Sequence, residues 1–382
     1  MFIINYGHME KKLMNKICVY AICKNEIKFL NRWLSSVSEA DYIVVLDTGS
    51  TDGTYEKLQS DHRVKKVKQK IYDKFRFDVA RNDAMKLAPK DANILVSIDI
   101  DEVFEPGWAD LVRNSWIEGV HTRVRYKYAW SHLADGTPSD VFINDKMHTR
   151  DYYWKYPVHE VLWRDEPEAP GSSLNIDQIL IQHYPDPEKS QSRYYELMEL
   201  RVQENPTDYY SRYLFARECG LAGDYNRALN EFTFTLTLPD IKEKAYLCYI
   251  GSLILRADLL FVLGRIEDAI IAYSSILLED KTYREPYLRL AEICYSNGMY
   301  NAAIGYVQDC LKISEQHFNW VEQAPAWSFR PWDILSLAYA GLEDWGNAVQ
   351  YSEMALRYAP NDVRLQNNYK LFTESYQKYI TN

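Results

Sequence analysis

Apolar and polar positions follow different patterns in the two halves of the chain. Before about residue 182, short apolar runs alternate with stretches of helical spacing, whereas from about residue 190 the spacing is helical throughout. The expected strands of the first half cover residues 17–22, 42–46 and 94–98, and the expected helices cover 27–37, 55–60 and 78–87. This alternation predicts an α/β domain with a mostly parallel sheet and flanking crossover helices.

The helical half contains a repeated pattern. In four places a turn residue is preceded by a small residue seven positions earlier and followed by an alanine five positions later. The turn residues are Gly223, Gly264, Gly298 and Glu343, the preceding residues are Ala216, Ala257, Ala291 and Ser336, and the following ones are Ala228, Ala269, Ala303 and Ala348. A spacing of 34 residues and small residues at helix contacts are typical of tetratricopeptide repeats. We predict about four helical hairpins and a terminal helix over 362–379. A generic helical bundle is the alternative.

Polar side chains follow three of the expected strands, where sheets of this kind bind ligands. They are Asn25 and Glu26, Asp47, and the pair Asp99 and Asp101. Carboxylates at the end of a buried strand cost free energy unless they are paired or bind a cation. Two acids spaced i, i+2 can reach one Mg²⁺ or Mn²⁺ ion, which also takes oxygens from a substrate diphosphate. A solvated strand-to-loop exit is the alternative interpretation of the Asp99 segment.

The composition is that of a soluble globular protein. The chain has 382 residues, enough for two or three domains, of which 47% are apolar and 26% are charged. A net charge of −10 argues against broad nucleic-acid binding, and the basic segment 63–70 is interpreted as an edge strand with solvated lysines. The six cysteines indicate buried thiols in a reducing compartment. Because no apolar run suits a membrane span and the first residues lack signal-peptide features, we expect a cytoplasmic protein.

Four motifs of the first half resemble, in order, those of the family 2 glycosyltransferases, which have the nucleotide-sugar-binding fold called GT-A. They are the strand that ends in Asn25-Glu26, the segment Asp47-Thr48-Gly49-Ser50-Thr51-Asp52-Gly53-Thr54, the triplet Ala80-Arg81-Asn82 and the triplet Asp99-Ile100-Asp101. Residues 157–160 and 181–185 are similar to a subgroup in which tetratricopeptide repeats follow the transferase. That subgroup includes the peptide S-glycosyltransferase that modifies sublancin.

The resemblance implies roles in donor binding. Asp47 would hydrogen-bond the nucleobase, typically uracil, and Asn25 and Glu26 would line the base and ribose pocket. Asp52 is expected to cap the following helix rather than to contact the ligand. Arg81 would lie near the nucleotide diphosphate, which suits the charge and fork geometry of a guanidinium group. A surface helix charge is the alternative for Arg81.

The resemblance also implies a metal site. Asp101 is the expected direct ligand of Mn²⁺ or Mg²⁺. Asp99 would either bind the metal, directly or through water, or contact the ribose. His183 is a candidate third ligand, with a purely structural histidine as the alternative. His159 is the alternative ligand or an acceptor-site residue.

The function that follows is a metal-dependent, inverting transfer of a sugar from a nucleotide sugar, expected to be a UDP-sugar. The metal would neutralise the leaving diphosphate, and a base near the acceptor would activate the nucleophile. Glu160 is the expected base, and Asp145 is the second choice. The acceptor is unidentified, with a protein or a glycan among the candidates. The repeats would bind the acceptor, form a homodimer or do both.

The expected domains are an N-terminal extension over 1–15, a GT-A domain over 16–189 and a tetratricopeptide-like domain over 190–382 with a capping helix. A second hypothesis is a degenerate transferase-like scaffold whose repeats bind protein partners, but the intact Asp47, Arg81, Asp99 and Asp101 argue against it. A third is a nucleotidyltransferase or nucleotide-sugar hydrolase. Residues 17–30 contain no glycine for a phosphate loop, which argues against the nucleotidyltransferase.

Overall fold

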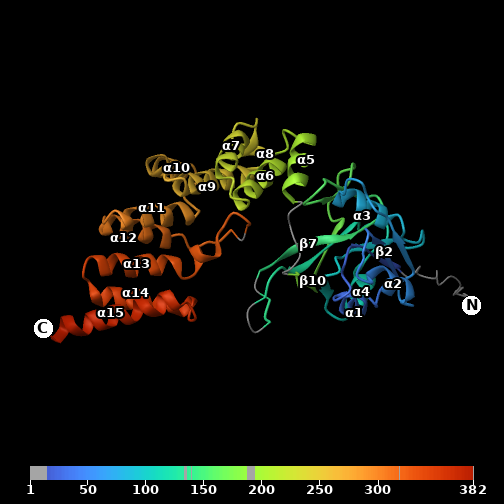
Figure 1. The fold of residues 1–382 in the computed structure, drawn as a ribbon, viewed down its shortest axis with the longest axis horizontal. Coiled ribbons are helices and arrows are strands. Elements are labelled where there is room, and N and C mark those ends of the chain that lie inside the picture. The colour runs from blue at the N-terminus through green and yellow to red at the C-terminus, as the bar shows by residue number, and fades with distance from the viewer. Residues whose placement is uncertain (1–14, 133–135, 139, 187–193, 318, 382) are drawn as a thin grey trace, which may run out of the picture. The chain divides into compact units, whose positions relative to one another are not determined.

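The computed structural model describes residues 15–132, 136–138, 140–186, 194–317 and 319–381. The chain forms two compact units, one ending at Arg201 and one beginning at Val202 (Figure 1). The expected domain boundary at 189/190 and residues 1–14 of the expected extension lie outside the described residues. Asn15 is buried and donates from its side chain to the carbonyl oxygens of Arg113 and Trp116, so it packs as part of the first unit.

The first unit is built on one large sheet. Its strands are β1 (Ile17–Cys23), β2 (Tyr42–Asp47), β3 (Lys66–Gln69), β4 (Ile94–Ser97), β5 (Glu102–Phe104), β6 (Arg123–Ala129), β7 (Val141–His148), β8 (Tyr153–Lys155), β9 (Val161–Trp163) and β10 (Ser173–His183). Its helices are α1 (Leu30–Ser36), α2 (Thr54–Ser60), α3 (Phe77–Met85) and α4 (Trp108–Ser115), and α5 (Tyr194–Glu204) crosses into the second unit.

The sheet is mostly parallel, as predicted. Among the described residues its order is β3-β2-β1-β4-β7-β6-β10-β5, and β8 and β9 form a separate hairpin. The strands β3, β2, β1 and β4 are parallel to their neighbours, as are β6 and β10, while β7 and β5 pair antiparallel. The basic segment supplies β3, an edge strand with exposed lysines, which confirms its interpretation.

Both faces of the sheet are covered, as the continuous apolar runs require. Odd-numbered residues of β1, such as Val19, pack with Trp33 of α1 and Trp108 of α4. Even-numbered residues, such as Tyr20, pack with Ala84 of α3 on the other face. Because β1 pairs parallel with both β2 and β4, the carboxyl ends of these strands lie together at one end of the sheet.

Two local features differ from expectation. The helix expected at 27–37 begins only at Leu30. It is preceded by a turn in which the N–H of Phe29 donates to the carbonyl oxygen of Glu26 and the N–H of Ile27 donates to Oδ2 of Asp52. The segment after Asp101 was expected to be a loop, but Glu102 begins the short strand β5, which pairs with β10 at the edge of the sheet. Oδ1 of Asp52 also accepts from the N–H of Thr54 at the start of α2.

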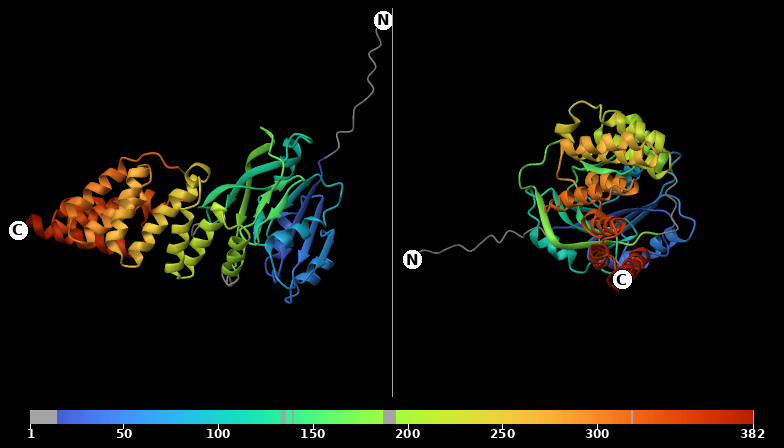
Figure 2. Two further views of the ribbon diagram at one scale, coloured as in Figure 1. Left: turned by 90° about the horizontal axis from the view of Figure 1, so that it is seen from above. Right: turned by 90° about the vertical axis from the view of Figure 1, so that its left-hand side faces the viewer.

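The second unit is entirely helical in its described residues. Its helices are α6 (Tyr209–Leu221), α7 (Tyr225–Thr235), α8 (Ile241–Lys244), α9 (Tyr246–Val262), α10 (Ile266–Glu279), α11 (Glu285–Ser296), α12 (Tyr300–Leu311), the 3₁₀ turn η1 (Ala324–Trp327), α13 (Arg330–Gly341), α14 (Trp345–Tyr358) and α15 (Val363–Thr381). Hairpins form from α6 and α7, α9 and α10, α11 and α12, and α13 and α14, and α15 packs on α14. Successive hairpins stack as layers of this unit (Figure 2).

The repeat prediction is confirmed in its details. All eight small residues of the repeated pattern are buried, because two helices of a hairpin touch at those points. The three turn glycines have φ between 72° and 82°, and Glu343 has φ of 60° at the equivalent turn. A glutamate in this backbone region shows that the fourth hairpin keeps the same turn at some conformational cost. The terminal helix is present as α15, and none of the described helices is long and apolar enough to cross a membrane.

Candidate active site

Asp47 ends strand β2 in a turn that its own side chain organises. The side chain is buried, and its Oδ1 accepts hydrogen bonds from the N–H groups of Gly49 and Ser50 and from Nε2 of Gln69, each at 2.9 Å. Gly49 has φ of 110°, which favours glycine. Burial alone would raise the pKa of Asp47, but the hydrogen bonds from Ser50, Gln69 and Gly49 lower it below its ordinary value. Neutral donors therefore hold this carboxylate in its ionised form.

The turn after β1 is fastened to the loop that follows β2. The backbone N–H groups of Asn25 and Glu26 donate to the hydroxyl oxygens of Ser50 and Thr54, both at 2.8 Å. Glu26 is buried, and Asn25 has φ of 57°, a conformation that asparagine tolerates better than most residues. Both residues thus lie next to the Asp47 turn and help to fix its shape.

Arg81 of α3 lies between two acids that are far apart in the sequence. Its guanidinium forms a two-point ion pair with Asp99, at 2.8 Å and 2.9 Å, and its Nε donates to Oε1 of Glu160 at 2.5 Å. The side chain is buried, and its guanidinium lies 5.0 Å from the ring of Trp154. Burial alone would lower the pKa of Arg81, but the charges of Asp99 and Glu160 raise it well above its ordinary value. Arg81 is therefore a fixed cation, not the surface charge of the alternative interpretation.

Lys146 of β7 is a second, partly buried cation of this centre, and no sequence motif indicated it. Its Nζ lies 3.0 Å from Oε1 of Glu102 and 3.6 Å from Oδ2 of Asp99. Glu102 also accepts hydrogen bonds from the hydroxyl of Tyr128 and from the N–H of Asp99. Burial raises the pKa of Glu102 above its ordinary value, with a contribution from the charge of Asp99 that Lys146 opposes. No local pattern marks Lys146, because β7 comes beside the acids only through its pairing with β4.

Asp101 and His183 face each other where β10 ends. Nε2 of His183 lies 3.6 Å from Oδ2 of Asp101, and the His183 ring stacks on Trp130 with 4.5 Å between ring centroids. Burial alone would lower the pKa of His183, but the nearby carboxylate of Asp101 raises it. Among the described residues, no three His, Cys, Asp or Glu side chains form a group that could hold a metal ion. Asp101 and His183 together offer one oxygen and one nitrogen donor.

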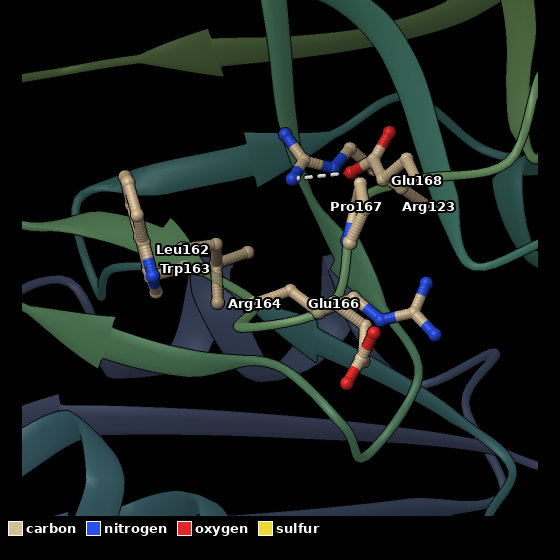
Figure 3. Close-up of a pocket in the computed structure, with 7 residues that line it drawn as sticks. All are labelled: Arg123, Leu162, Trp163, Arg164, Glu166, Pro167 and Glu168. Atoms are coloured by element: carbon tan, nitrogen blue, oxygen red, sulfur yellow. Dashed lines mark ion pairs between the residues drawn. The ribbon is translucent and has the colours of Figure 1, made fainter.

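A pocket of about 320 Å³ opens beside Glu160 and contains both candidate bases. It is lined by Arg123, Asn144, Asp145, Lys146, Trp154, Glu160, Val161 and Leu162. Asp145 is ion-paired with Arg123 at 2.5 Å. Figure 3 shows a second pocket that shares Arg123 and Leu162 with the first, and there Arg123 pairs with Glu168 at 2.7 Å. Arginine, carboxylate and indole groups thus line one polar recess next to the Arg81 centre.

His159 contacts residues of helix α5. Its carbonyl oxygen accepts from Nη1 of Arg201 at 2.8 Å, and its ring is 5.9 Å from that of Tyr194. Of the aromatic residues at 152–156, Trp154 lines the pocket, while Tyr152 is buried in the core. Nε1 of Trp154 donates to the hydroxyl of Tyr20, which ties the pocket wall to β1.

Residues 18–134 match the model of a protein family described as Glycosyl transferase family 2. This segment is a glycosyltransferase family 2 domain. The matched residues include Asn25, Glu26, Asp47, Arg81 and the Asp99–Asp101 pair, and they end before Lys146, Glu160 and His183. The domain supports glycosyl transfer as the general activity. Among curated proteins no match to the chain was found.

Several solved structures that are similar to part of the chain are described as tetratricopeptide repeat proteins. One from Parabacteroides merdae is 18% identical with a TM-score of 0.38, and the match covers 48% of this chain and 66% of that one. A thermophilic TPR protein of Thermus thermophilus is 18% identical with a TM-score of 0.36, covering 48% of this chain and 90% of the other. The C-terminal part of a TPR protein from Cytophaga hutchinsonii is 14% identical with a TM-score of 0.39, covering 49% and 69%. At such low TM-scores the repeat assignment rests on the hairpins themselves.

Proposed function

We propose that the first unit transfers a sugar from a nucleotide sugar, expected to be a UDP-sugar, to an acceptor with inversion of configuration and with a divalent metal. The observation that carries this proposal is the Arg81 bridge, in which one buried guanidinium holds both Asp99 and Glu160. A leaving diphosphate develops negative charge, which preorganised cations in a buried site stabilise strongly. A diphosphate would have to compete with Asp99 and Glu160 for this guanidinium, and the bridge holds an acid of the Asp-x-Asp motif and a candidate base on one buried cation.

Asp101 and His183 are the side chains that fit a divalent ion best. Their facing oxygen and nitrogen atoms, 3.6 Å apart, could both reach one Mn²⁺ or Mg²⁺ ion, and diphosphate oxygens and water would complete the ligand set. Both oxygens of Asp99 are engaged by Arg81, which favours contact with the ribose or with a metal-bound water over direct ligation. A metal bound there would neutralise the diphosphate as the sugar–phosphate bond breaks.

Glu160 is positioned to act on the acceptor. The pocket of about 320 Å³ would receive the acceptor, because Glu160 lies in its wall. Glu160 would take the proton from the acceptor's nucleophilic atom as that atom bonds to the anomeric carbon. The bond from that carbon to the diphosphate breaks, and its electron pair leaves with the diphosphate. Asp145, in the same wall, is the second candidate base.

The nucleotide would bind beside the Asp47 turn. Because the Asp47 side chain is buried and its Oδ1 already accepts three hydrogen bonds, we propose that it acts mainly by fixing the turn over residues 48–50. Oδ2, which contacts the Cys23 thiol at 3.4 Å, is the oxygen left for the uracil N–H. Asn25 and Glu26 would border the same pocket.

The helical unit would bind the acceptor, form a homodimer or do both, since arrays of helical hairpins present long surfaces suited to extended partners. The alternative is a catalytically degenerate scaffold that binds protein partners. The Arg81 bridge argues against it, because pairing a buried guanidinium with two partly buried carboxylates contributes little net stability to a scaffold.

A panel of nucleotide sugars tests the proposal. Each donor is incubated with the protein and Mn²⁺ or Mg²⁺, and release of the free nucleotide by slow hydrolysis is measured. We expect one UDP-sugar to be hydrolysed in a metal-dependent manner, and adding EDTA to stop the reaction. If no donor is hydrolysed or bound in the presence of either metal, the scaffold hypothesis replaces the transferase.

A further inference from the structure

Strand β7 extends beyond the strand that covers its outer side. It pairs with β6 over most of its length, but with β4 only at Met147 and His148. Among the residues that the structure describes, no other strand pairs with β7 on the side away from β6. We call residues 141–146 on this side the open edge. It begins where β4 ends at Ser97, so it lies beside the segment that carries Asp99.

The backbone groups of the open edge alternate in direction. The N–H of Trp130, at the end of β6, donates to the carbonyl oxygen of Asp140 at 2.8 Å. Hydrogen-bonded and non-hydrogen-bonded pairs alternate along an antiparallel ladder, so Phe142 also directs its N–H and C=O toward β6. The N–H and C=O groups of Val141 and Ile143 consequently point outward. The open edge thus presents donors and acceptors at the spacing of a strand.

The two outermost strands of the sheet are protected against pairing with another chain, whereas the open edge is not. Strand β3 carries exposed lysines, and β5 is only three residues long. In the open edge Val141, Phe142 and Ile143 are 45%, 47% and 44% exposed. Because successive side chains of a strand point to opposite faces, apolar groups are exposed on both faces here. Apolar side chains beside open backbone groups favour the addition of a further strand.

The open edge leads into the pocket that contains the two candidate bases. Residues 144–146 line this pocket from β7, and residues 160–162 line it from the start of β9. A β-bulge bends β7 at this point, because Asp145 and Lys146 together lie opposite Arg125 alone. A chain that lies along the open edge would therefore enter the pocket between β7 and β9.

We propose that the acceptor is an extended segment of a polypeptide, which adds to the open edge as a further strand and presents a hydroxyl or thiol side chain to Glu160. Such an acceptor rests on the proposed function and gives its substrate class. A glycan lacks the alternating N–H and C=O groups that match an open strand edge, whereas an extended peptide has them. A second copy of the chain paired at this edge would close the pocket that the acceptor has to enter.

The transfer step has the chemistry of the proposed function. Glu160 takes the proton of the side-chain hydroxyl or thiol, and the oxygen or sulfur bonds to the anomeric carbon. The bond from that carbon to the diphosphate breaks, and its electron pair leaves with the diphosphate. In this binding mode main-chain hydrogen bonds provide the affinity, and side chains that enter pockets provide the specificity.

The test compares transfer to peptides with hydrolysis of the same donor. A donor that the full chain hydrolyses is supplied with short synthetic peptides that have a central serine, threonine or cysteine and random flanks. A pool of oligosaccharides is tested in parallel. Mass spectrometry should show the sugar on peptides and not on oligosaccharides. Methylation of single backbone nitrogens in the best peptide should then reduce transfer about tenfold at every second position, because alternate N–H groups face β7.

Two variants at one position separate backbone contacts from side-chain contacts. Ile143→Pro removes an outward N–H, a change that edge strands tolerate, and it should lower peptide transfer about tenfold relative to donor hydrolysis by the same variant. Ile143→Thr keeps the N–H and a β-branched side chain, so its peptide transfer should fall by no more than about threefold. Urea unfolding checks the fold of both variants. If Ile143→Pro does not fold, the methylated peptides with the wild-type chain still decide the matter.

Failure of the proposed function and failure of the peptide acceptor give different results. If no donor is hydrolysed, the proposed function is overturned, and the peptide acceptor with it. Three results would overturn the peptide acceptor alone: donor hydrolysis without a modified peptide, methylation losses without a two-residue period, and equal losses for folded Ile143→Pro and Ile143→Thr. A wild-type dimer that Ile143→Pro converts to a monomer in size-exclusion chromatography would also overturn it, because a second copy would then occupy the open edge.

Discussion

Two carboxylates at the same edge of the sheet are held in opposite ways. Asp47 is buried, and its partners are neutral N–H groups, two of them within three residues along the chain. Asp99 is partly exposed, and its partners are the cations Arg81 and Lys146, which come from a helix and a strand distant in sequence. The first arrangement builds a fixed turn. The second builds a centre of opposed charges, where a charged ligand must compete with ion pairs that already exist.

In the proposed donor site, the hydrogen bonds of Asp47 would fix the shape of a turn, whereas the ion pairs of Asp99 would respond to a charged ligand. Neutral hydrogen bonds keep their geometry whether or not a nucleotide is present. Ion pairs in a partly buried centre respond to added charge, because the local dielectric constant is low. Substitutions in the two arrangements should therefore have effects of different size and different pH dependence.

The largest effect should come from Glu160→Gln. This change keeps the shape of the side chain but removes the proposed base and one of the two charges on Arg81. We expect transfer to fall by about 10²- to 10⁴-fold, while calorimetry shows donor binding within a few-fold of wild type. Asp145→Asn is the matched control in the same pocket and should lose less than tenfold. Unchanged transfer by Glu160→Gln would remove Glu160 as base.

Arg81→Met should have the largest effect on stability. It leaves Asp99 and Glu160 without their shared cation, and breaking a buried ion pair from one side costs about 3–5 kcal/mol. Urea denaturation measures the change. Lys86→Met is the control, since Lys86 is exposed and pairs with Asp83 at the end of the same helix, and it should cost at most about 1 kcal/mol. Equal losses for the two variants would contradict the claim that Arg81 is a buried cation on which Asp99 and Glu160 depend.

His148 is a buried side chain that is neutral at pH 7 but can take up a proton as the pH falls, so it makes stability depend on pH. His148 of β7 accepts from the hydroxyl of Tyr20 and donates to the carbonyl oxygen of Thr149. Burial lowers its pKa from the ordinary 6.5 to about 4. Because the unfolded chain binds the proton more readily, the stability contribution is complete above about pH 6.5 and is lost as pH falls toward 4.

The expected size of this effect is about 2 kcal/mol at pH 5 relative to pH 7. Urea unfolding at the two values measures it, and the difference should shrink by about that amount in His148→Gln, which has no titrating group. If wild type and variant lose the same stability on acidification, His148 is not the neutral group that the hydrogen bonds indicate.

The smallest effect should come from Asp47→Asn. At neutral pH the loss of hydrogen bonds to a charged acceptor should cost about 1 kcal/mol, less than Arg81→Met, because the turn keeps an oxygen acceptor. The native pKa of Asp47 is lowered, so its stability contribution is present above about pH 4 and disappears as pH falls through the native pKa. The cost of the substitution, measured by urea unfolding, should therefore shrink in acid. A cost that is constant down to pH 2 would mean that the charge of Asp47 plays no part.

Features that depend on residues close together in the sequence could be predicted, whereas features that depend on distant residues could not. The strand ends at Asn25, Asp47 and Asp99 follow from apolar runs and local turn residues, so their common location at one edge could be inferred. The repeat turns were equally visible, including the one at Glu343. Such features depend on neighbours a few positions away, or on a pattern that recurs.

The Arg81 centre could be predicted only in part. The motif that contains Arg81 pointed to a phosphate contact, whereas its guanidinium is bound by two acids, one of them 79 positions away. Lys146 was missed because its position beside Asp99 and Glu102 depends on an antiparallel strand inserted into a mostly parallel sheet. Long-range pairing of this kind leaves no periodic trace in the sequence.

The most direct test of the proposed transferase is Asp101→Ala, measured as Mn²⁺-dependent release of nucleotide from a donor that wild type hydrolyses. Asp110→Ala, which alters an exposed aspartate on α4, is the control for folding and handling. We expect Asp101→Ala to lose at least about 10²-fold in turnover, to lose Mn²⁺ binding and to unfold at nearly the same urea concentration as Asp110→Ala. Full turnover by Asp101→Ala with that donor would contradict the metal site and the mechanism built on it.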